Sequence, residues 1–286
     1  MNRPVISIEF FPPKTPEGER TLLEKTLPAL LQVDPDFCSV TYGAGGSTRD
    51  KTLMIVDRIQ RVHGLTAMAH LTCVDATREQ IGEFLAEAKA RGIRNILALR
   101  GDPPAGVSEF TAPENGFVYS YQLIDFIGQM GGFSIGTAGF PESHLAYIEG
   151  KNVDWDRLKA KIDHGADFVL TQLFFENADF FEFRDYMTKT LGVTVPICPG
   201  VLPILSTDQI KRFTSLCGAR LPEPLVSRLE QLGDDTEAVT DFGIEYATKQ
   251  CEELLRGGVP GLHLYSLNKA RSTSKILKNL GLDRVE

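Results

Sequence analysis

Short apolar, β-branched segments alternate with longer amphipathic segments along the whole chain, and this alternation constrains the fold more than any other feature. Strict strand–helix alternation requires parallel strands, because every return connection must cross a face of the sheet. Eight such units in 286 residues favour a closed (β/α)8 TIM barrel over an open sheet. The predicted strands are residues 5–10, 36–42, 66–72, 93–100, 134–139, 167–172, 193–199 and 261–265.

The sequence between the predicted strands is helical in pattern and shows no boundary between domains. No composition break or Ser/Gly-rich linker divides the chain, so we expect a single α/β domain over residues 1–286. The segment 207–256 is too long for one crossover helix. Its pattern predicts two or three helices before the last strand.

Charge and cysteine usage exclude several classes of function. The chain has 30 Lys and Arg against 38 Asp and Glu, a net charge of −8, which argues against nucleic acid as a partner. No apolar run is long enough for a membrane span, and the N-terminus does not resemble a signal peptide. The five cysteines are single, without a CxxC pair, and no His pair has metal-ligand spacing. We therefore expect a cytoplasmic protein with reduced thiols and no metal.

Polar residues gather at the predicted C-terminal ends of the strands, where barrels of this class carry their sites. A helix cap or a loop hydrogen bond would explain any one of them alone. Their joint placement at one rim favours a functional site. The residues are Glu9, Thr41, Tyr42, His70, Arg100, Gly101, Asp102, Phe140, Glu142 and Gln172.

Glu9 is the most informative of these residues. It stands between Ile8 and Phe10-Phe11, directly before two prolines that end the strand. Apolar neighbours predict a desolvated carboxyl with a raised pKa, which suits a general acid near neutral pH. The alternative is a structural ion pair with Lys14 or an arginine.

Six segments, taken in order, resemble the methylenetetrahydrofolate reductase family. The resemblance covers almost the whole chain at matching strand positions. The chain is similar to the short bacterial type, which is a catalytic barrel without the regulatory domain of the animal enzymes. The segments are residues 7–14 (SIEFFPPK), 39–46 (SVTYGAGG), 99–104 (LRGDPP), 171–175 (TQLFF), 198–203 (CPGVLP) and 265–270 (YSLNKA).

The resemblance implies an FAD-dependent oxidoreductase, often a homo-oligomer. Such an enzyme uses NAD(P)H to reduce 5,10-methylenetetrahydrofolate to 5-methyltetrahydrofolate, with hydride passing through the flavin. Glu9 matches the family's general acid, which protonates the leaving nitrogen as the methylene bridge opens. Asp102 matches a carboxylate that stabilises the resulting 5-iminium cation, and Gln172 matches a residue that holds the pterin.

The remaining site residues are also carried over from the resemblance. Lys161 is suited to an FAD phosphate as a point charge, or is an ordinary surface lysine. The flavin contacts it implies are Thr41, Tyr42, His70, Arg100, Gly101, Asp102, Ser120, Phe140, His144, Asp154 and Lys161. The folate contacts are Glu9, Gln172, Gln209, Phe213 and Lys269.

Some of these positions depart from the family pattern or have an alternative reading. Lys269 stands where an arginine is expected, and a lysine cannot form the planar two-point contact with a carboxylate. Phe140 stands where tyrosine is common, which removes a hydroxyl donor. Phe213 shares a helix face with Ile210 and Leu216, so core packing is an alternative to stacking on folate.

Two other functions stay open at the level of sequence. One is a different FAD barrel, such as one resembling proline dehydrogenase. The other is a flavin- or folate-binding subunit of a larger complex, reduced by a partner protein instead of a nicotinamide. The sequence carries no separate nicotinamide-binding motif. The residues alone therefore do not distinguish such a subunit from a reductase that uses NAD(P)H.

Overall fold

Eight parallel strands form a closed barrel in the computed structural model, with β1 to β8 in sequence order around the ring and β8 paired with β1. This confirms the predicted (β/α)8 fold. The structure describes residues 3–42, 49–102, 111–145 and 149–283. The strands are β1 (Val5–Phe10), β2 (Phe37–Val40), β3 (Thr66–Thr72), β4 (Asn95–Leu99), β5 (Ser134–Gly139), β6 (Phe168–Leu173), β7 (Ile197–Val201) and β8 (Gly261–Tyr265).

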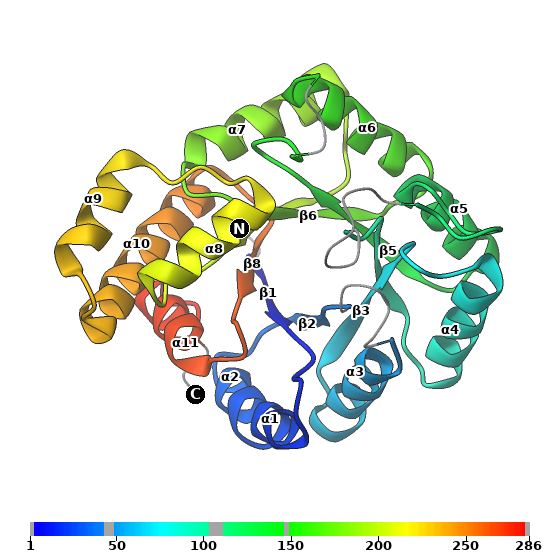
Figure 1. The fold of residues 1–286 in the computed structure, drawn as a ribbon, viewed down its shortest axis with the longest axis horizontal. Helices are drawn as coiled ribbons and strands as arrows, with labels where there is room; N and C mark the ends of the chain where they lie inside the picture. The colour runs from blue at the N-terminus through cyan, green and yellow to red at the C-terminus, as the bar shows by residue number, and fades with distance from the viewer. Residues whose placement is uncertain (1–2, 43–48, 103–110, 146–148, 284–286) are drawn as a thin grey trace.

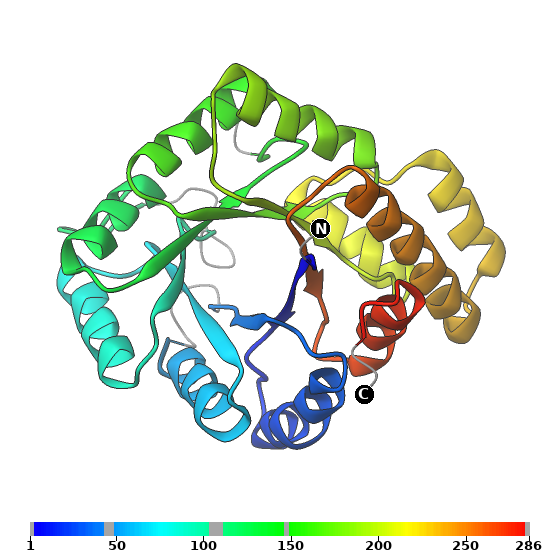
Figure 2. The same cartoon turned by 180° about the vertical axis from the view of Figure 1, so that it is seen from behind.

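The helices form a ring outside the barrel (Figure 1), which Figure 2 shows from the opposite side. The three helices α8, α9 and α10 before β8 confirm the predicted insertion, and they lie together on one side of the ring. The helices are α1 (Pro16–Thr21), α2 (Leu27–Leu31), α3 (Arg49–His63), α4 (Arg78–Ala90), α5 (Ser120–Met130), α6 (Lys151–Asp163), α7 (Asn177–Asp185), α8 (Thr207–Cys217), α9 (Glu223–Leu232), α10 (Thr236–Arg256) and α11 (Ala270–Asn279).

Local sequence explains where several helices begin and how the first one is built. Thr77 forms a capping box at the start of α4, because its hydroxyl accepts the Gln80 amide while the Gln80 side chain accepts the Thr77 amide. Between α1 and α2, residues Leu22–Thr26 form a π-helical turn. Pro28 follows directly in α2, and the wider turn accommodates a residue that has no N–H.

Side-chain alternation along the strands divides the apolar core into an outer and an inner part. Outward-facing residues such as Ile8 and Phe10 pack against the helices. Inside the barrel, Met68, Leu97 and Leu170 form a separate apolar cluster with partly buried neighbours from β2, β4, β6 and β7. The strands β8, β1, β2 and β3 instead carry buried polar side chains at alternating positions, which are Ser7, Glu9, Ser39, His70 and His263.

Among the described helices, none combines the length and the apolar run that a bilayer crossing requires. The five cysteines are free thiols. Within the described ranges, no three His, Cys, Asp or Glu side chains are grouped so as to hold a metal ion.

Candidate active site

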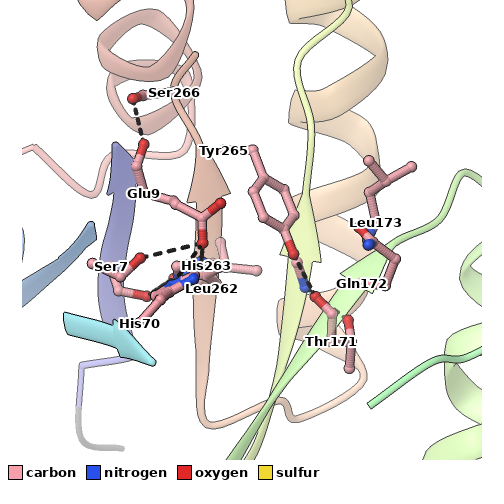
Figure 3. Close-up of polar contacts among 12 residues, drawn as sticks. Ser7, Glu9, His70, Thr171, Gln172, Leu173, Leu262, His263, Tyr265 and Ser266 are labelled. Carbon is pink, nitrogen blue, oxygen red and sulfur yellow. Dashed lines mark hydrogen bonds and ion pairs between the residues drawn. The ribbon is translucent and has the colours of Figure 1, made fainter. Parts of the chain in front are cut away.

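The carboxylate of Glu9 lies inside the barrel, in contact with side chains from three other strands (Figure 3). Ser39 on β2 donates its hydroxyl to Oε2 at 3.3 Å. His263 Nε2 on β8 lies 3.3 Å from the same oxygen, and so does His70 Nε2 on β3, although His70 lacks hydrogen-bond geometry. Glu9 is only 6% exposed, so this carboxylate depends on its protein partners for its charge state.

The pKa of Glu9 is shifted in the direction opposite to the sequence prediction. Burial by itself would raise it, but the nearby imidazoles of His70 and His263, the latter also within hydrogen-bond distance, together lower it to about 2. The prediction was wrong because Ile8 and Phe10 point to the opposite face of the strand, toward the helices. In place of the ion pair considered with Lys14 or an arginine, the carboxylate has two histidine partners.

His263 and Ser7 extend the cluster, and sequence reasoning missed both of them. His263 Nδ1 lies 2.8 Å from Ser7 Oγ, and His263 is only 1% exposed. The periodicity of the strands could have found them, since residues two apart on a strand share a face. Ser7 stands two residues before Glu9, and His263 two residues before Tyr265.

The loop after β8 fixes the end of the strand that carries Glu9. Asn268 Oδ1 accepts the Phe11 amide at 2.9 Å, and Asn268 Nδ2 donates to the Phe11 carbonyl at 2.7 Å. Ser266 Oγ donates to the Glu9 carbonyl at 2.6 Å. Asn268 has φ +56°, a left-handed conformation that asparagine tolerates better than most residues. The loop therefore extends the β1–β8 seam beyond the two strands.

A second group of residues surrounds Asp154 at the start of α6. Asp154 is buried, and its Oδ2 accepts the His144 backbone amide at 3.0 Å. Electrostatic interactions connect His144 with Arg100, Asp102, Asp154 and Lys161. The fold thus brings five of the expected flavin contacts together from the ends of β4 and β5 and from α6. Two cations beside one buried carboxylate form a donor set suited to phosphate oxygens.

Burial shifts the pKa values of this second group. It lowers the pKa of Lys161 to about 8, with Arg100 adding to the effect and Asp154 opposing it. Burial also raises the pKa of Asp154 and lowers that of His144. Lys161 Nζ donates to the Ala138 carbonyl at 3.0 Å, which directs the ammonium toward the end of β5. The alternative of an ordinary exposed lysine is therefore wrong.

Phe140 and Gly101 lie just after β5 and β4, and both have close contacts there. The Phe140 ring meets the His144 ring edge-on with centroids 4.8 Å apart, and its carbonyl accepts Trp155 Nε1 at 3.0 Å. Gly101 has φ +85°, and a Cβ there would lie 2.9 Å from Thr72 Cβ. Only glycine allows the chain to turn at this point after β4.

The other expected flavin contacts lie at element ends. The Thr41 amide donates to the Phe10 carbonyl at 2.9 Å, directly after β2. The Tyr42 ring packs edge-on against Phe84 of α4, and burial raises its pKa. Ser120 is the first residue of α5. The matched positions 43–46 and 103–104 lie outside the described residues.

The four expected folate contacts other than Glu9 are spread over β6, α8 and the start of α11. Gln172 is partly buried, and its Oε1 accepts the Leu173 amide at 2.9 Å. Phe213 packs against the apolar cluster of Ile210, but Leu216 is 67% exposed and is not part of that packing, contrary to expectation. Among the described residues, no hydrogen bond or ion pair joins Gln172, Gln209, Phe213 or Lys269 to Glu9.

The sequence profile described as methylenetetrahydrofolate reductase matches residues 1–281. The chain belongs to this family. It is 37% identical to the 5,10-methylenetetrahydrofolate reductase of Escherichia coli K12, over 97% of this chain and 90% of that one. It is 41% identical to methylenetetrahydrofolate reductase (NADH) 1 of Arabidopsis thaliana, over 96% of this chain and 48% of that one. The chain therefore spans about half the length of the plant methylenetetrahydrofolate reductases that it matches.

A solved structure supports the barrel fold of this methylenetetrahydrofolate reductase family member. It is an uncharacterized protein from Clostridium thermocellum that binds two copies of 5-methyl-5,6,7,8-tetrahydrofolic acid. The two structures superpose with a TM-score of 0.68 at 17% identity, over 97% of this chain and 93% of that one. At this identity the likeness concerns the fold alone.

Proposed function

We propose that the protein reduces 5,10-methylenetetrahydrofolate to 5-methyltetrahydrofolate, using NADH or NADPH through a bound FAD. Family membership and the names of the bacterial and plant relatives support this reaction. The observation that carries the proposal is the buried carboxylate of Glu9 at the end of β1, set between two histidines. Carboxylate and imidazole together are the usual means by which a protein moves a proton near neutral pH.

The group around Asp154 fits the cofactor. Lys161 and Arg100 would bind phosphate oxygens, and Asp154 would hold the loop that carries His144. Thr41, Tyr42, His70, Gly101, Ser120 and Phe140 are proposed as further contacts with FAD. When bound, FAD would supply the hydride chemistry that links the nicotinamide to the folate.

The side chains around Glu9 supply the proton that the reaction needs. Opening the methylene bridge requires a proton on the leaving nitrogen, and it produces a 5-iminium cation. With a pKa of about 2, Glu9 is an anion at neutral pH, so it must receive a proton before it can donate one. His263 passes that proton to Oε2 of Glu9, and Glu9 passes it to the substrate nitrogen, becoming a carboxylate again.

Other residues bind and orient the folate in this proposal. Gln172 binds the pterin, and Asp102 stabilises the iminium cation with its negative charge. Gln209 and Phe213 contact the folate from α8, and the exposed ammonium of Lys269 binds a tail carboxylate. Because a lysine makes a single-point contact, the tail is bound less specifically than by an arginine.

An anaerobic reductive titration tests the proposed function. We expect the purified protein to be yellow, to bleach with NADH or NADPH, and to regain its colour with 5,10-methylenetetrahydrofolate. A protein that ignores both nicotinamides but bleaches with 5-methyltetrahydrofolate would instead be a subunit reduced by a partner protein. A colourless preparation that releases no flavin on denaturation would contradict the proposal.

The pH dependence of FAD binding is expected to follow Lys161. Its pKa of about 8 in the free protein means that the ammonium loses its charge as the pH rises through 8. An anionic phosphate binds the charged form, so the Kd for FAD should be constant below this pH and rise by up to about tenfold per pH unit above it. Fluorescence titration of the flavin-free protein between about pH 6.5 and 9.5 measures this profile.

Replacing the lysine by methionine separates this effect from general alkaline destabilisation. Lys161→Met should bind FAD more weakly at neutral pH and show a flat profile above pH 8. Lys159→Met, two residues earlier on α6 and paired with Asp163, should retain the profile of the unmodified protein. A rise in Kd that persists in Lys161→Met would exclude this lysine as the phosphate contact.

A further inference from the structure

The register between β6 and β7 shifts at the residue expected to hold the pterin. Leu170 pairs with Cys198 and Leu173 pairs with Gly200, so Thr171 and Gln172 together stand opposite the single residue Pro199. The other seven strand pairs of the described barrel keep a constant register. Such a bulge re-aims the side chains at the shift, and bulges are common beside active sites.

Two hydrogen bonds from other strands hold the bulged residue Thr171. The Gly200 amide on β7 donates to Thr171 Oγ1 at 2.9 Å. The Tyr265 hydroxyl on β8 donates to the Thr171 carbonyl at 2.7 Å, which it reaches by passing β7 (Figure 3). The carbonyl of Thr171 belongs to the peptide group that joins it to Gln172. A bond to that oxygen therefore fixes the peptide plane from which Gln172 extends.

Gly200 leaves the space through which Tyr265 reaches β6. A Cβ at position 200 would lie 2.2 Å from the Thr171 oxygen and 2.8 Å from both Cε2 and the hydroxyl oxygen of Tyr265. Burial raises the pKa of Tyr265 well above its ordinary value, and the nearby Glu9 carboxylate adds to the effect. The phenol thus keeps its proton and remains a hydrogen-bond donor at neutral pH.

We propose that Tyr265 is a positioning residue that aims Gln172 at the pterin by fixing the Thr171–Gln172 peptide. This inference rests on the proposed function, since Gln172 is taken to bind folate. The Tyr265 ring stands between Glu9 and Gln172, edge-on to the His263 ring at 5.2 Å (Figure 3). One side chain therefore links the strand of the proposed acid cluster to the strand of the pterin contact.

Tyr265→Phe tests this role, because it removes the hydroxyl and keeps the ring. We expect the Kd for 5-methyltetrahydrofolate, measured by calorimetry, to rise by about tenfold, the usual effect of one lost hydrogen bond. Flavin reduction by NADH should be unchanged. Tyr246→Phe is a matched control, since the Tyr246 hydroxyl donates to the Phe175 carbonyl at 2.8 Å, just beyond β6. It should leave folate binding as it is in the unmodified protein.

A double-mutant cycle decides whether Tyr265 acts through Gln172. In the Gln172→Ala background, Tyr265→Phe should cause no further loss of folate affinity. Independent, additive losses would overturn the inference, and so would an unchanged Kd in Tyr265→Phe alone.

A readout without ligand separates this inference from the proposed function. The side-chain amide signals of Gln172, assigned in ¹⁵N spectra by their loss in Gln172→Ala, should shift in Tyr265→Phe and stay in place in Tyr246→Phe. If the unmodified protein binds no folate, the proposed function fails, while these spectra still test the positioning. Unmoved Gln172 signals in Tyr265→Phe would overturn it.

Discussion

Glu9→Gln is expected to abolish folate reduction while the protein still oxidises NADH with a quinone acceptor. The amide has nearly the size of the carboxyl group, but it cannot pass a proton from His263 to the substrate. Loss of a general acid lowers a rate by about 10²- to 10⁴-fold. Stopped-flow measurement of the two half-reactions checks this, because flavin reduction by NADH does not require the acid.

Comparing the two half-reactions shows whether Glu9 acts on folate reduction alone or holds the structure of the site. Glu17→Gln, a change of an exposed carboxylate at the start of α1, should leave both half-reactions as they are. If Glu9→Gln slowed flavin reduction as much as folate reduction, Glu9 would have a structural role. The histidines would then serve to neutralise a buried charge and not to supply a proton.

Trp155→Ala should lower the free energy of unfolding by about 3–5 kcal/mol, the typical cost of truncating a buried large aromatic side chain. Trp155 is 1% exposed on α6, and its ring packs against Phe183 and Tyr186. Its indole nitrogen also holds the Phe140 carbonyl. Urea denaturation at a fixed FAD concentration measures the loss, which is a large part of the stability of an ordinary domain.

Trp155→Phe separates packing from the hydrogen bond. It keeps an aromatic ring and removes the donor to Phe140, so the loss should be smaller than for alanine. We also expect weaker FAD binding in both variants, because Phe140 and His144 lie on the loop that Trp155 anchors. A Trp155→Ala protein as stable as the unmodified one would contradict the packing described here.

The strand pattern of the sequence predicts most of the barrel correctly. Strands β1, β3, β5 and β8 have the predicted bounds. The seventh strand begins at Ile197, whereas the sequence predicts that it begins at Val193. Val193 is buried there, but its amide donates to the Met187 carbonyl before the strand begins. Hydrophobicity predicts burial, while the start of a strand depends on hydrogen bonds that come from elsewhere in the chain.

The place of Glu9 in the barrel was predictable from the sequence, but its electrostatics were not. The sequence places Glu9 at the end of a strand, and the resemblance assigns it a role, but its neighbours in the sequence are not its neighbours in the barrel. The lowered pKa comes from His70 and His263, which are distant in sequence and adjacent only after the ring closes. The bulge at Gln172 also has no local signal, because Tyr265 and Gly200 support it from other strands.

The seam between β1 and β8 has a consequence for the synthesis of the protein. Glu9 is translated well before its partners His263 and Ser266, which follow it by 254 and 257 residues. Asn268, which holds Phe11, follows that residue by 257 positions. A nascent chain stopped before these residues can pair most of its strands but cannot complete the acid's surroundings. The environment that sets the charge of Glu9 thus forms only once β8 has been synthesised.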